Sequence, residues 1–275
     1  MDAWRDRVKT VLTKSERHRM RASFDTVGDI AIVEIARGLA RKEKRLAAIL
    51  LASQPAIKVV AKKVGGHTGR FRHQPLKVLA GERRLETEHR ESGVRLRLNV
   101  QTCYFSPRMG TERLRIARLV KPGERVLVLF SGIGPFALII AKNARPSHVD
   151  AVELNPAAHA YALQNVALNK LQSIVTPIKK DAKRFLASTK TTYDRVLLAW
   201  PGKAAPFIPG ALRVLKKGGT LHFYDFAHED AFAAAAQTVK DACAKAKRTC
   251  SIKRVVACGQ YKPHVNRVCV DALVR

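Results

Sequence analysis

The sequence predicts an α/β protein whose main domain is a doubly wound, mostly parallel sheet, preceded by a small basic α+β domain. Strand-like runs alternate with helical runs of roughly 10–15 residues from about residue 113 onward, which is typical of parallel βαβ units. A length of 275 residues suits one large or two modest domains. We expect a charged N-terminal arm or helix at 1–22, the small domain at 23–108 and the α/β domain at 109–275.

The first half of the chain carries short, irregular elements. The first twenty or so residues are highly charged and are expected to form a helix or arm outside any core. In residues 24–35 apolar and polar side chains first alternate and are then mostly apolar, which indicates a strand entered through a turn at Gly28 and Asp29. A helix is expected over 42–51 and a short strand after it, and the glycines and basic residues of 65–73 indicate a loop that faces a partner.

The second half is regular. Helices are expected at 115–120, 136–144, 159–170, 207–215 and 230–248, and strands at 125–130, 148–154, 174–180, 193–200 and 220–226. No apolar run approaches the roughly 18 residues that a membrane-spanning helix needs, so no membrane association is expected.

The charge of the chain points to a polyanionic partner. Lys and Arg number 51 against 22 Asp and Glu, a formal net charge of +29, which exceeds what solubility alone requires. RNA is favoured over a membrane surface because the basic residues are interleaved with an ordinary globular pattern. The five cysteines form no CxxC pair and no metal-ligand spacing, so reduced thiols, no metal and no secretion are expected.

A glycine loop follows the apolar strand at 125–130. Gly132 and Gly134 stand between that strand and a helix, where glycines let backbone approach a ligand closely. Glu153 ends the next expected strand and can accept both ribose hydroxyls of a nucleoside, and Asp181 ends the third strand near an adenine edge. Because Pro135 and Phe136 stand where a dinucleotide fingerprint needs small residues, a phosphate-free adenosyl ligand is favoured over a dinucleotide.

Several longer segments resemble the archaeal and eukaryotic tRNA (guanine-37-N1)-methyltransferases. They are YFSPRMGTERLRIARLV, FSGIGPFALIIAK, ELNPAAHAYALQNVALNK, GGTLHFY and the closing YKPHVNRVCVD, with shorter matches from Phe24 onward. The resemblance implies a Rossmann-like class I methyltransferase domain, S-adenosylmethionine as cofactor, and the purine at position 37 of the tRNA anticodon stem-loop as target. The separate N-terminal domain of that family is expected to be absent.

The same resemblance assigns roles to individual residues. It places the general base on Glu112 and a supporting arginine on Arg113; Arg108 and Arg72 are candidates for holding the exocyclic oxygen of the base. A competing interpretation makes Glu112 and Arg113 a solvated first turn of a helix. The expected cofactor-binding residues are Tyr104, Phe130, Gly132, Gly134, Pro135, Phe136, Glu153, Leu154, Asn155, Asp181, Ala182, Ala199 and Pro201.

Three features depart from the family pattern. Ala199, Trp200 and Pro201 replace an Asn-x-Pro motif that lies against the target base, so Trp200 either stacks on the base or fills the vacated core space. Val128 and Asn99 replace acidic residues.

Two other functions stay open. One is the related transfer of the aminocarboxypropyl group in the tRNA wybutosine pathway; the other is RNA binding by a degenerate site. A cytoplasmic monomer is expected in each case.

Overall fold

The computed structural model describes residues 3–20 and 23–275, and the chain divides into two compact units. Unit 1 comprises Met1–Arg90 and Arg95–Pro107, and unit 2 comprises Glu91–Val94 and Arg108–Arg275. The domain boundary expected after residue 22 falls beside residues 21–22, which lie outside the described part of the chain.

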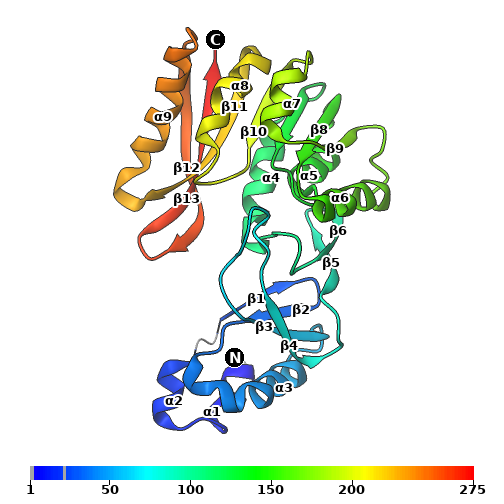
Figure 1. Ribbon diagram of the computed structural model, residues 1–275, viewed down its shortest axis with the longest axis vertical. Coiled ribbons are helices and arrows are strands. Elements are labelled where there is room, and N and C mark those ends of the chain that lie inside the picture. The colour runs from blue at the N-terminus through cyan, green and yellow to red at the C-terminus, as the bar shows by residue number, and fades with distance from the viewer. Residues whose placement is uncertain (1–2, 21–22) are drawn as a thin grey trace. The chain divides into compact units, whose positions relative to one another are not determined.

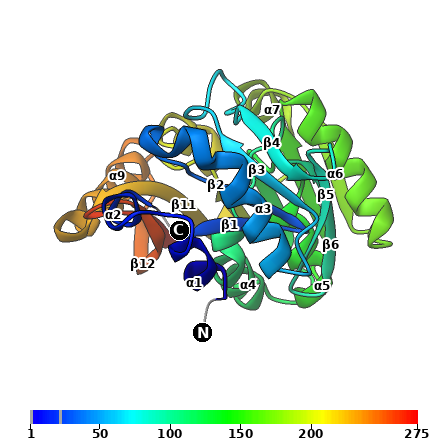
Figure 2. The same ribbon diagram turned by 90° about the horizontal axis from the view of Figure 1, so that it is seen from below.

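Unit 1 is built on a four-stranded sheet in the order β1-β2-β3-β4. Its strands are β1 (Phe24–Val27), β2 (Ile30–Val33), β3 (Val59–Lys63) and β4 (Leu76–Gly81), of which only β2 and β3 pair in parallel. The segment expected as one strand is therefore a hairpin, turned at Gly28 with φ +56°. The helix α3 (Glu43–Ser53), entered through η1 (Arg37–Lys42), packs on this sheet (Figures 1 and 2).

The N-terminal segment belongs to the core of unit 1, so the expectation that it lies outside any core is wrong. Helix α1 (Ala3–Lys9) is followed by α2 (Lys14–Arg19). Trp4, Val8 and Leu12 are buried in one cluster with residues of α3, including Leu46 and Leu50. Trp4 and Val8 are four residues apart on one face of α1, and Leu12 follows in the turn before α2, a pattern that the surrounding charges conceal in the sequence.

A separate two-stranded hairpin joins β5 (Glu86–Glu91) to β6 (Val94–Asn99). Ser92 and Gly93 both have positive φ, at 47° and 81°, which is the geometry of a tight hairpin turn. Along β6 the apolar residues are buried and Arg95 and Arg97 are exposed, as alternation requires.

Unit 2 contains a seven-stranded sheet in the order β12-β13-β11-β10-β7-β8-β9. Its strands are β7 (Arg125–Leu129), β8 (His148–Glu153), β9 (Val175–Lys179), β10 (Tyr193–Leu198), β11 (Leu215–His228), β12 (Cys250–Lys262) and β13 (Val265–Val274). The first five are parallel, and β13 pairs antiparallel with both β11 and β12. The mostly parallel sheet confirms the predicted fold class.

The helices of unit 2 pack against this sheet (Figure 1). Helix α4 (Gly110–Leu119) packs on α5 (Pro135–Ala144), and α6 (Pro156–Leu168) contacts β8 and β9. The helices α7 (Ala182–Ser188), α8 (Ile208–Val214) and α9 (Phe232–Lys245) share one apolar cluster with β7, β10 and β11. The short helices η2 (Pro107–Met109), η3 (Ala205–Phe207) and η4 (Glu229–Ala231) complete the fold.

Two findings about the elements of unit 2 go beyond the expected pattern. Helix α4 begins five residues before the run expected at 115–120, so Glu112 and Arg113 lie in its first turn. The long hairpin of β12 and β13 was not predicted from the sequence, and it contains both Asp271 and Tyr261.

Candidate functional site

The carboxyl edge of the parallel strands gathers most of the expected cofactor residues. Strand β7 pairs with β8 on one side and β10 on the other, so the strand order reverses beside β7, which is where a doubly wound sheet is expected to form a ligand crevice. The loop after β7 lies at this position, with Phe130 at φ 59°, Gly132 at φ 56° and Gly134 at φ 88°. Gly134 is the N-cap of α5 and Pro135 its first residue.

Gly134 is needed for its backbone conformation. A side chain there would meet Leu138 at 3.5 Å and Ala162 at 3.8 Å, which is ordinary contact with the protein. Its φ of +88° is what other residues rarely adopt.

Glu153 braces the loop through its carboxylate. Oε2 accepts a hydrogen bond from the backbone N–H of Gly132 at 2.8 Å, and Oε1 accepts from Leu154 at 2.8 Å and Asn155 at 2.7 Å. Burial raises the pKa of this carboxyl, although the three backbone donors act in the opposite direction. A carboxylate offers about four acceptor positions, so one position on Oε2 is left for a ligand hydroxyl.

Ser131 provides a further polar atom in the same loop, although no sequence motif distinguishes it. Its hydroxyl is buried and has no hydrogen-bond partner within the described residues. An unpaired buried hydroxyl costs about 1–3 kcal/mol, which a ligand that pairs with it would offset.

Other expected cofactor residues have structural tasks. Asn155 caps α6, accepting from the backbone of Ala157 and Ala158, and Asp181 caps α7, accepting from Lys183 and Arg184. Ala182 is buried in the core at the start of α7. These caps fix the ends of β8 and β9 at the crevice.

The departure from Asn-x-Pro lies at the end of β10. The Trp200 ring packs 4.8 Å from Phe130 and 6.3 Å from Phe207, between ring centroids, against the core of unit 2. This packing favours the interpretation in which Trp200 fills space. The two replaced acidic positions also have local explanations, since Val128 is fully buried in β7 and Asn99 accepts the turn hydrogen bonds of Gln101 and Thr102.

Glu112 and Arg113 are both buried, at 4% and 3% exposure, so the interpretation of a solvated first turn is wrong. Arg113 donates to both carboxylate oxygens of Glu91 at the β5–β6 turn. Glu112 Oε1 accepts from the hydroxyl of Tyr224 at 2.7 Å and from Arg115 Nη2 at 2.8 Å, and Oε2 accepts from Arg115 Nε at 2.6 Å. One acceptor position remains on Oε2.

Tyr224 contacts both Glu112 and the helix that follows the glycine loop. The ring of Phe136, in the first turn of α5, lies 5.6 Å from the Tyr224 ring between centroids. The buried carboxylate on α4 and the glycine loop before α5 are thus neighbours within unit 2.

A buried polar network continues from Glu112 across the sheet. Arg115 Nη1 donates to Asp271 Oδ2 at 2.6 Å, and Asp271 Oδ1 lies 2.6 Å from His222 Nδ1, its cross-strand partner. His222 Nε2 lies 2.6 Å from Nη1 of Arg195, which also binds Glu124. Because a guanidinium only donates, Nε2 accepts and the neutral ring carries its proton on Nδ1.

The pKa shifts agree with this pairing. Burial lowers the pKa of His222, which keeps the ring neutral although Asp271 acts in the opposite direction. Burial would raise the pKa of Asp271, but the hydrogen bonds from His222 and Arg115 outweigh it and hold that pKa well below its ordinary value.

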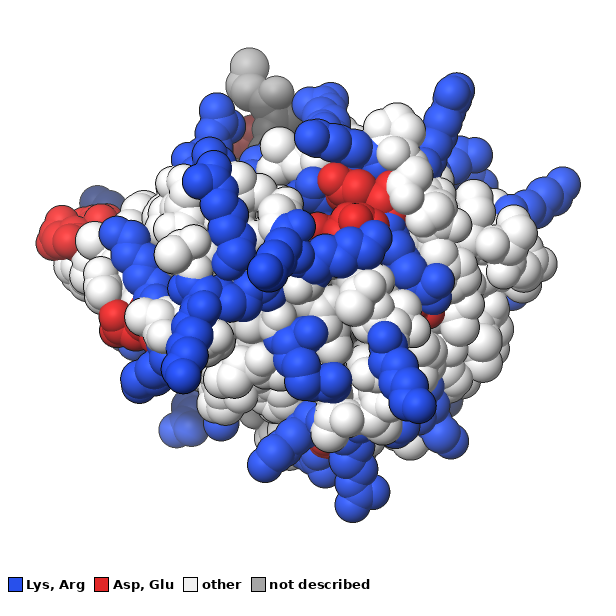
Figure 3. All heavy atoms as spheres, turned by 90° about the horizontal axis from the view of Figure 1, so that it is seen from above, with Lys and Arg blue, Asp and Glu red and all other residues white. Residues whose placement is uncertain are grey.

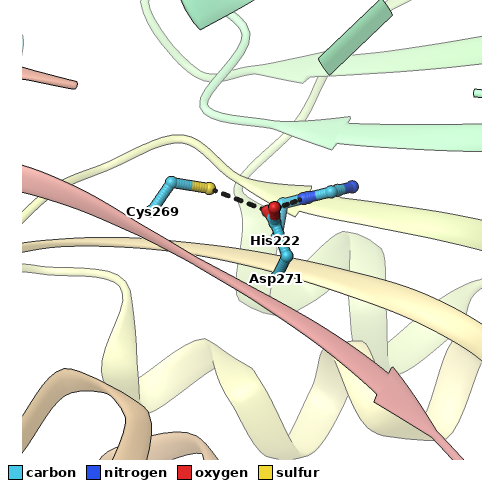
Figure 4. Close-up of side chains that lie close together, drawn as sticks. All are labelled: His222, Cys269 and Asp271. Carbon is cyan, nitrogen blue, oxygen red and sulfur yellow. Dashed lines mark hydrogen bonds and ion pairs between the residues drawn. The ribbon is translucent and has the colours of Figure 1, made fainter. Parts of the chain in front are cut away.

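His222, Cys269 and Asp271 converge closely enough to suggest metal ligands (Figure 4). Both ring nitrogens of His222 are already bonded, and Cys269 donates to Asp271 at 3.4 Å. The guanidiniums of Arg115 and Arg195 bind the same groups and would repel a cation. The cluster is therefore better explained as part of the polar network.

Two expected residues, Arg72 and Tyr104, lie in unit 1. The Arg72 guanidinium carbon stands 3.9 Å above the centre of the Tyr104 ring, and His67 packs edge-on against that ring at 5.2 Å. Arg108, in the continuous part of unit 2, is exposed on η2.

Cations are in excess over the surface. Figure 3 shows a face on which Lys and Arg side chains are widely spread and Asp and Glu are few. On the β5–β6 hairpin the carboxylate of Glu88 lies within 4 Å of Arg90, Arg95 and Arg97. Because the chain as a whole carries a formal net charge of +29, positive charge is in excess for a polyanion.

Two smaller observations concern the thiols and the helices. The five cysteines are free thiols, four of them buried. Among residues 3–20 and 23–275, no helix combines the length and apolarity required to cross a bilayer.

Comparison with known proteins places the chain. A family model described as TRM5/TYW2 methyltransferase domain matches residues 87–253. The chain belongs to this TRM5/TYW2 methyltransferase family. A second model, described as TYW2 N-terminal domain, matches residues 4–84. The family resemblance is thereby confirmed, and α1 and α2 fall within the matched N-terminal domain.

Relatives in the TRM5/TYW2 family are named for different activities. The tRNA (guanine(37)-N(1))-methyltransferase Trm5b of Pyrococcus abyssi is 36% identical over 78% of this chain, and the match spans 62% of that relative's length. The tRNA(Phe) (4-demethylwyosine(37)-C(7)) aminocarboxypropyltransferase of Methanocaldococcus jannaschii is 31% identical over 75% of this chain and 79% of its own. The solved complex of aTrm5 with tRNALeu matches with TM-score 0.88 and 28% identity, covering 99% of this chain and 78% of that one.

Proposed function

We propose that this protein is an S-adenosylmethionine-dependent tRNA (guanine-37-N1)-methyltransferase. The observation that carries the proposal is the buried carboxylate of Glu112, which keeps one acceptor position beside the cofactor edge. Membership of the TRM5/TYW2 family and the similarity to Trm5b support it. A cytoplasmic location remains part of the proposal, supported by the free thiols, and so does a monomeric state.

The polar groups of the loop after β7 suit an adenosyl ligand. The Ser131 hydroxyl and the remaining acceptor position of Glu153 are a donor and an acceptor for a ribose, and Asp181 stands at the end of the adjacent strand. The proposed site further includes Phe130, Gly132, Gly134, Pro135, Phe136, Leu154, Asn155, Ala182, Ala199 and Pro201. When bound, S-adenosylmethionine supplies an activated methyl group, so the protein needs mainly to position the target nitrogen.

The role of Glu112 is to take the N1 proton of guanine. The open position on Oε2 would accept that N–H, and Arg115 and Tyr224 fix the carboxylate in orientation. Arg113 holds the β5–β6 turn to α4 through Glu91.

RNA recognition is assigned to both units. Arg108 and Arg72 are proposed to hold the exocyclic oxygen, where negative charge develops as N1 loses its proton. Tyr104 supports the Arg72 guanidinium. The excess of cations would bind the phosphates of the anticodon stem-loop.

A second candidate is aminocarboxypropyl transfer to a tricyclic guanine derivative. It is favoured by the match to the TYW2 N-terminal domain and by the larger share of the M. jannaschii relative that the chain covers. A degenerate RNA-binding protein is less favoured, because Glu112, Ser131 and Glu153 would then be placed without purpose.

The test uses the purified chain, methyl-labelled S-adenosylmethionine and unmodified tRNA transcripts that differ only at position 37. We expect label to enter only the transcript with guanine. Label in both transcripts would mean that the methylated base is not at position 37. Tight RNA binding without transfer of label would favour the alternative of an RNA-binding protein with a degenerate site.

A further inference from the structure

Tyr261 lies near the tip of the long β12–β13 hairpin of unit 2, close to the end of β12. Its side chain is 54% exposed. Its ring stacks on Phe226 of β11, with centroids 4.1 Å apart and an interplanar angle of 29°. An exposed aromatic ring held flat by a second ring is unusual for a plain surface residue, because its apolar face is left in water.

The strand geometry places this pair close to Glu112. Side chains alternate along β11, so Phe226 shares a face with His222 and Tyr224. The Tyr224 hydroxyl bonds to Glu112, and Phe226 follows two residues later, roughly 7 Å further along the strand.

The loop after β10 approaches the same pair. A side chain at Gly202 would come within 3.1 Å of the Phe226 ring, and the Gly202 N–H donates to Asp225 at 3.0 Å. This loop begins with Ala199, Trp200 and Pro201, which stand in place of the family motif that lies against the target base. Lys203 and Lys262, both exposed, follow Gly202 and Tyr261 in the sequence.

We propose that Tyr261, backed by Phe226, is a stacking platform for an unpaired RNA base next to the target nucleotide. An exposed, flat aromatic face binds single-stranded nucleic acid by stacking on a base, and exposed lysines near it in the sequence add positive charge for the phosphates. A target base drawn out of its stack leaves its neighbours without a stacking partner, and the Tyr261 face replaces one. The inference rests on the proposed function, since it deepens the RNA specificity of the same site.

The experiment measures binding of an unmodified tRNA anticodon stem-loop with guanine at position 37 by fluorescence anisotropy. Tyr261→Ala is expected to weaken binding about 5- to 100-fold, and Tyr261→Phe to bind like the natural chain. Leu163→Ala is the matched control, because Leu163 on α6 is exposed to a similar degree, at 50%. That variant should bind unchanged.

A second RNA series makes the assignment specific. Stem-loops with an abasic residue on either side of position 37 are titrated with the natural chain and with Tyr261→Ala. At one of the two positions, the abasic residue should weaken RNA binding by the natural chain. At that same position it should weaken RNA binding by Tyr261→Ala no further.

Equal binding by Tyr261→Ala and the natural chain, or losses that simply multiply at both abasic positions, would overturn the platform while leaving the proposed function intact. Failure of the natural chain to bind the stem-loop at all would overturn both. S-adenosylmethionine binding, followed separately, checks that Tyr261→Ala remains folded.

Discussion

The glycine loop and the buried network around Glu112 are neighbours that are built in opposite ways. The loop is made from residues close in sequence, and its one carboxylate, Glu153, is held by three backbone N–H groups. The network joins side chains of α4, β10, β11 and β13, and the ion pair of Arg115 with Asp271 spans 156 positions. One short segment can contain the residues of a small-ligand site. A buried charge, in contrast, needs partners that only the folded sheet brings together.

The first prediction removes the proposed base from the network. Glu112→Gln keeps the shape of the side chain but not its proton acceptor, so turnover should fall about 100- to 10,000-fold. Affinities for S-adenosylmethionine and tRNA should change little, as measured by equilibrium binding. Glu82→Gln, an exposed carboxylate of unit 1, is the control and should keep full turnover. Intact turnover with a large loss of affinity would contradict the assignment.

The second prediction compares a buried with an exposed cation. Arg115→Met leaves Glu112 and Asp271 buried without their shared partner, and should cost about 3–5 kcal/mol of unfolding free energy. Lys216→Met breaks the half-exposed pair with Asp194 and should cost less than about 1 kcal/mol. Chemical denaturation measures both, and similar losses would show that the network does not stabilise the unit.

The third prediction separates backbone strain from ligand binding in the loop. Gly134 and Gly123 have φ of +88° and +81°, so Ala at either position should destabilise the fold by about 1–2 kcal/mol. Only Gly134→Ala should also weaken S-adenosylmethionine binding, measured by calorimetry, because Gly123 lies in a turn before β7. Equal cofactor affinity in the two variants would remove the loop from the site.

The fourth prediction concerns pH. The folded pKa of His222 lies below its ordinary value of 6.5, so the unfolded chain binds more protons below that pH. Stability should therefore fall as the pH drops below 6.5, by at most about 1.4 kcal/mol per unit from this group. Because the pKa of Asp271 is lowered in the fold, this group adds a further loss of stability as the pH drops below about 3.8.

His222→Gln tests that sign. The variant should lose the part of the pH dependence that lies between pH 7 and 5, seen in thermal unfolding at several pH values. An unchanged slope would mean that His222 is not held neutral in the fold.

The sequence predicted the loop well because its signals are local. Strand β7, Gly132, Gly134 and Glu153 follow one another with regular spacing, and periodicity locates such elements. The long segments shared with the TRM5/TYW2 family added Glu112, which charge alone would have placed in solvent.

The rest depended on contacts that no local pattern contains. Arg115, Tyr224 and Asp271 meet only because β13 returns beside β11, and β12 and β13 were not anticipated from the sequence. The burial of Trp4 was concealed by the charges around it. Ser131 was visible in the loop, but only its buried and unpaired hydroxyl distinguishes it from a plain turn residue.

The most direct test of the central claim labels S-adenosylmethionine at two different places. One preparation carries the label on the methyl group, the other on the carboxyl carbon, and each is incubated with unmodified tRNA that has guanine at position 37. Methyl transfer from the proposed site predicts that only the methyl label enters the RNA, and that Glu112→Gln prevents it. Entry of the carboxyl label would contradict the claim, because the aminocarboxypropyl group would then be the one that is transferred.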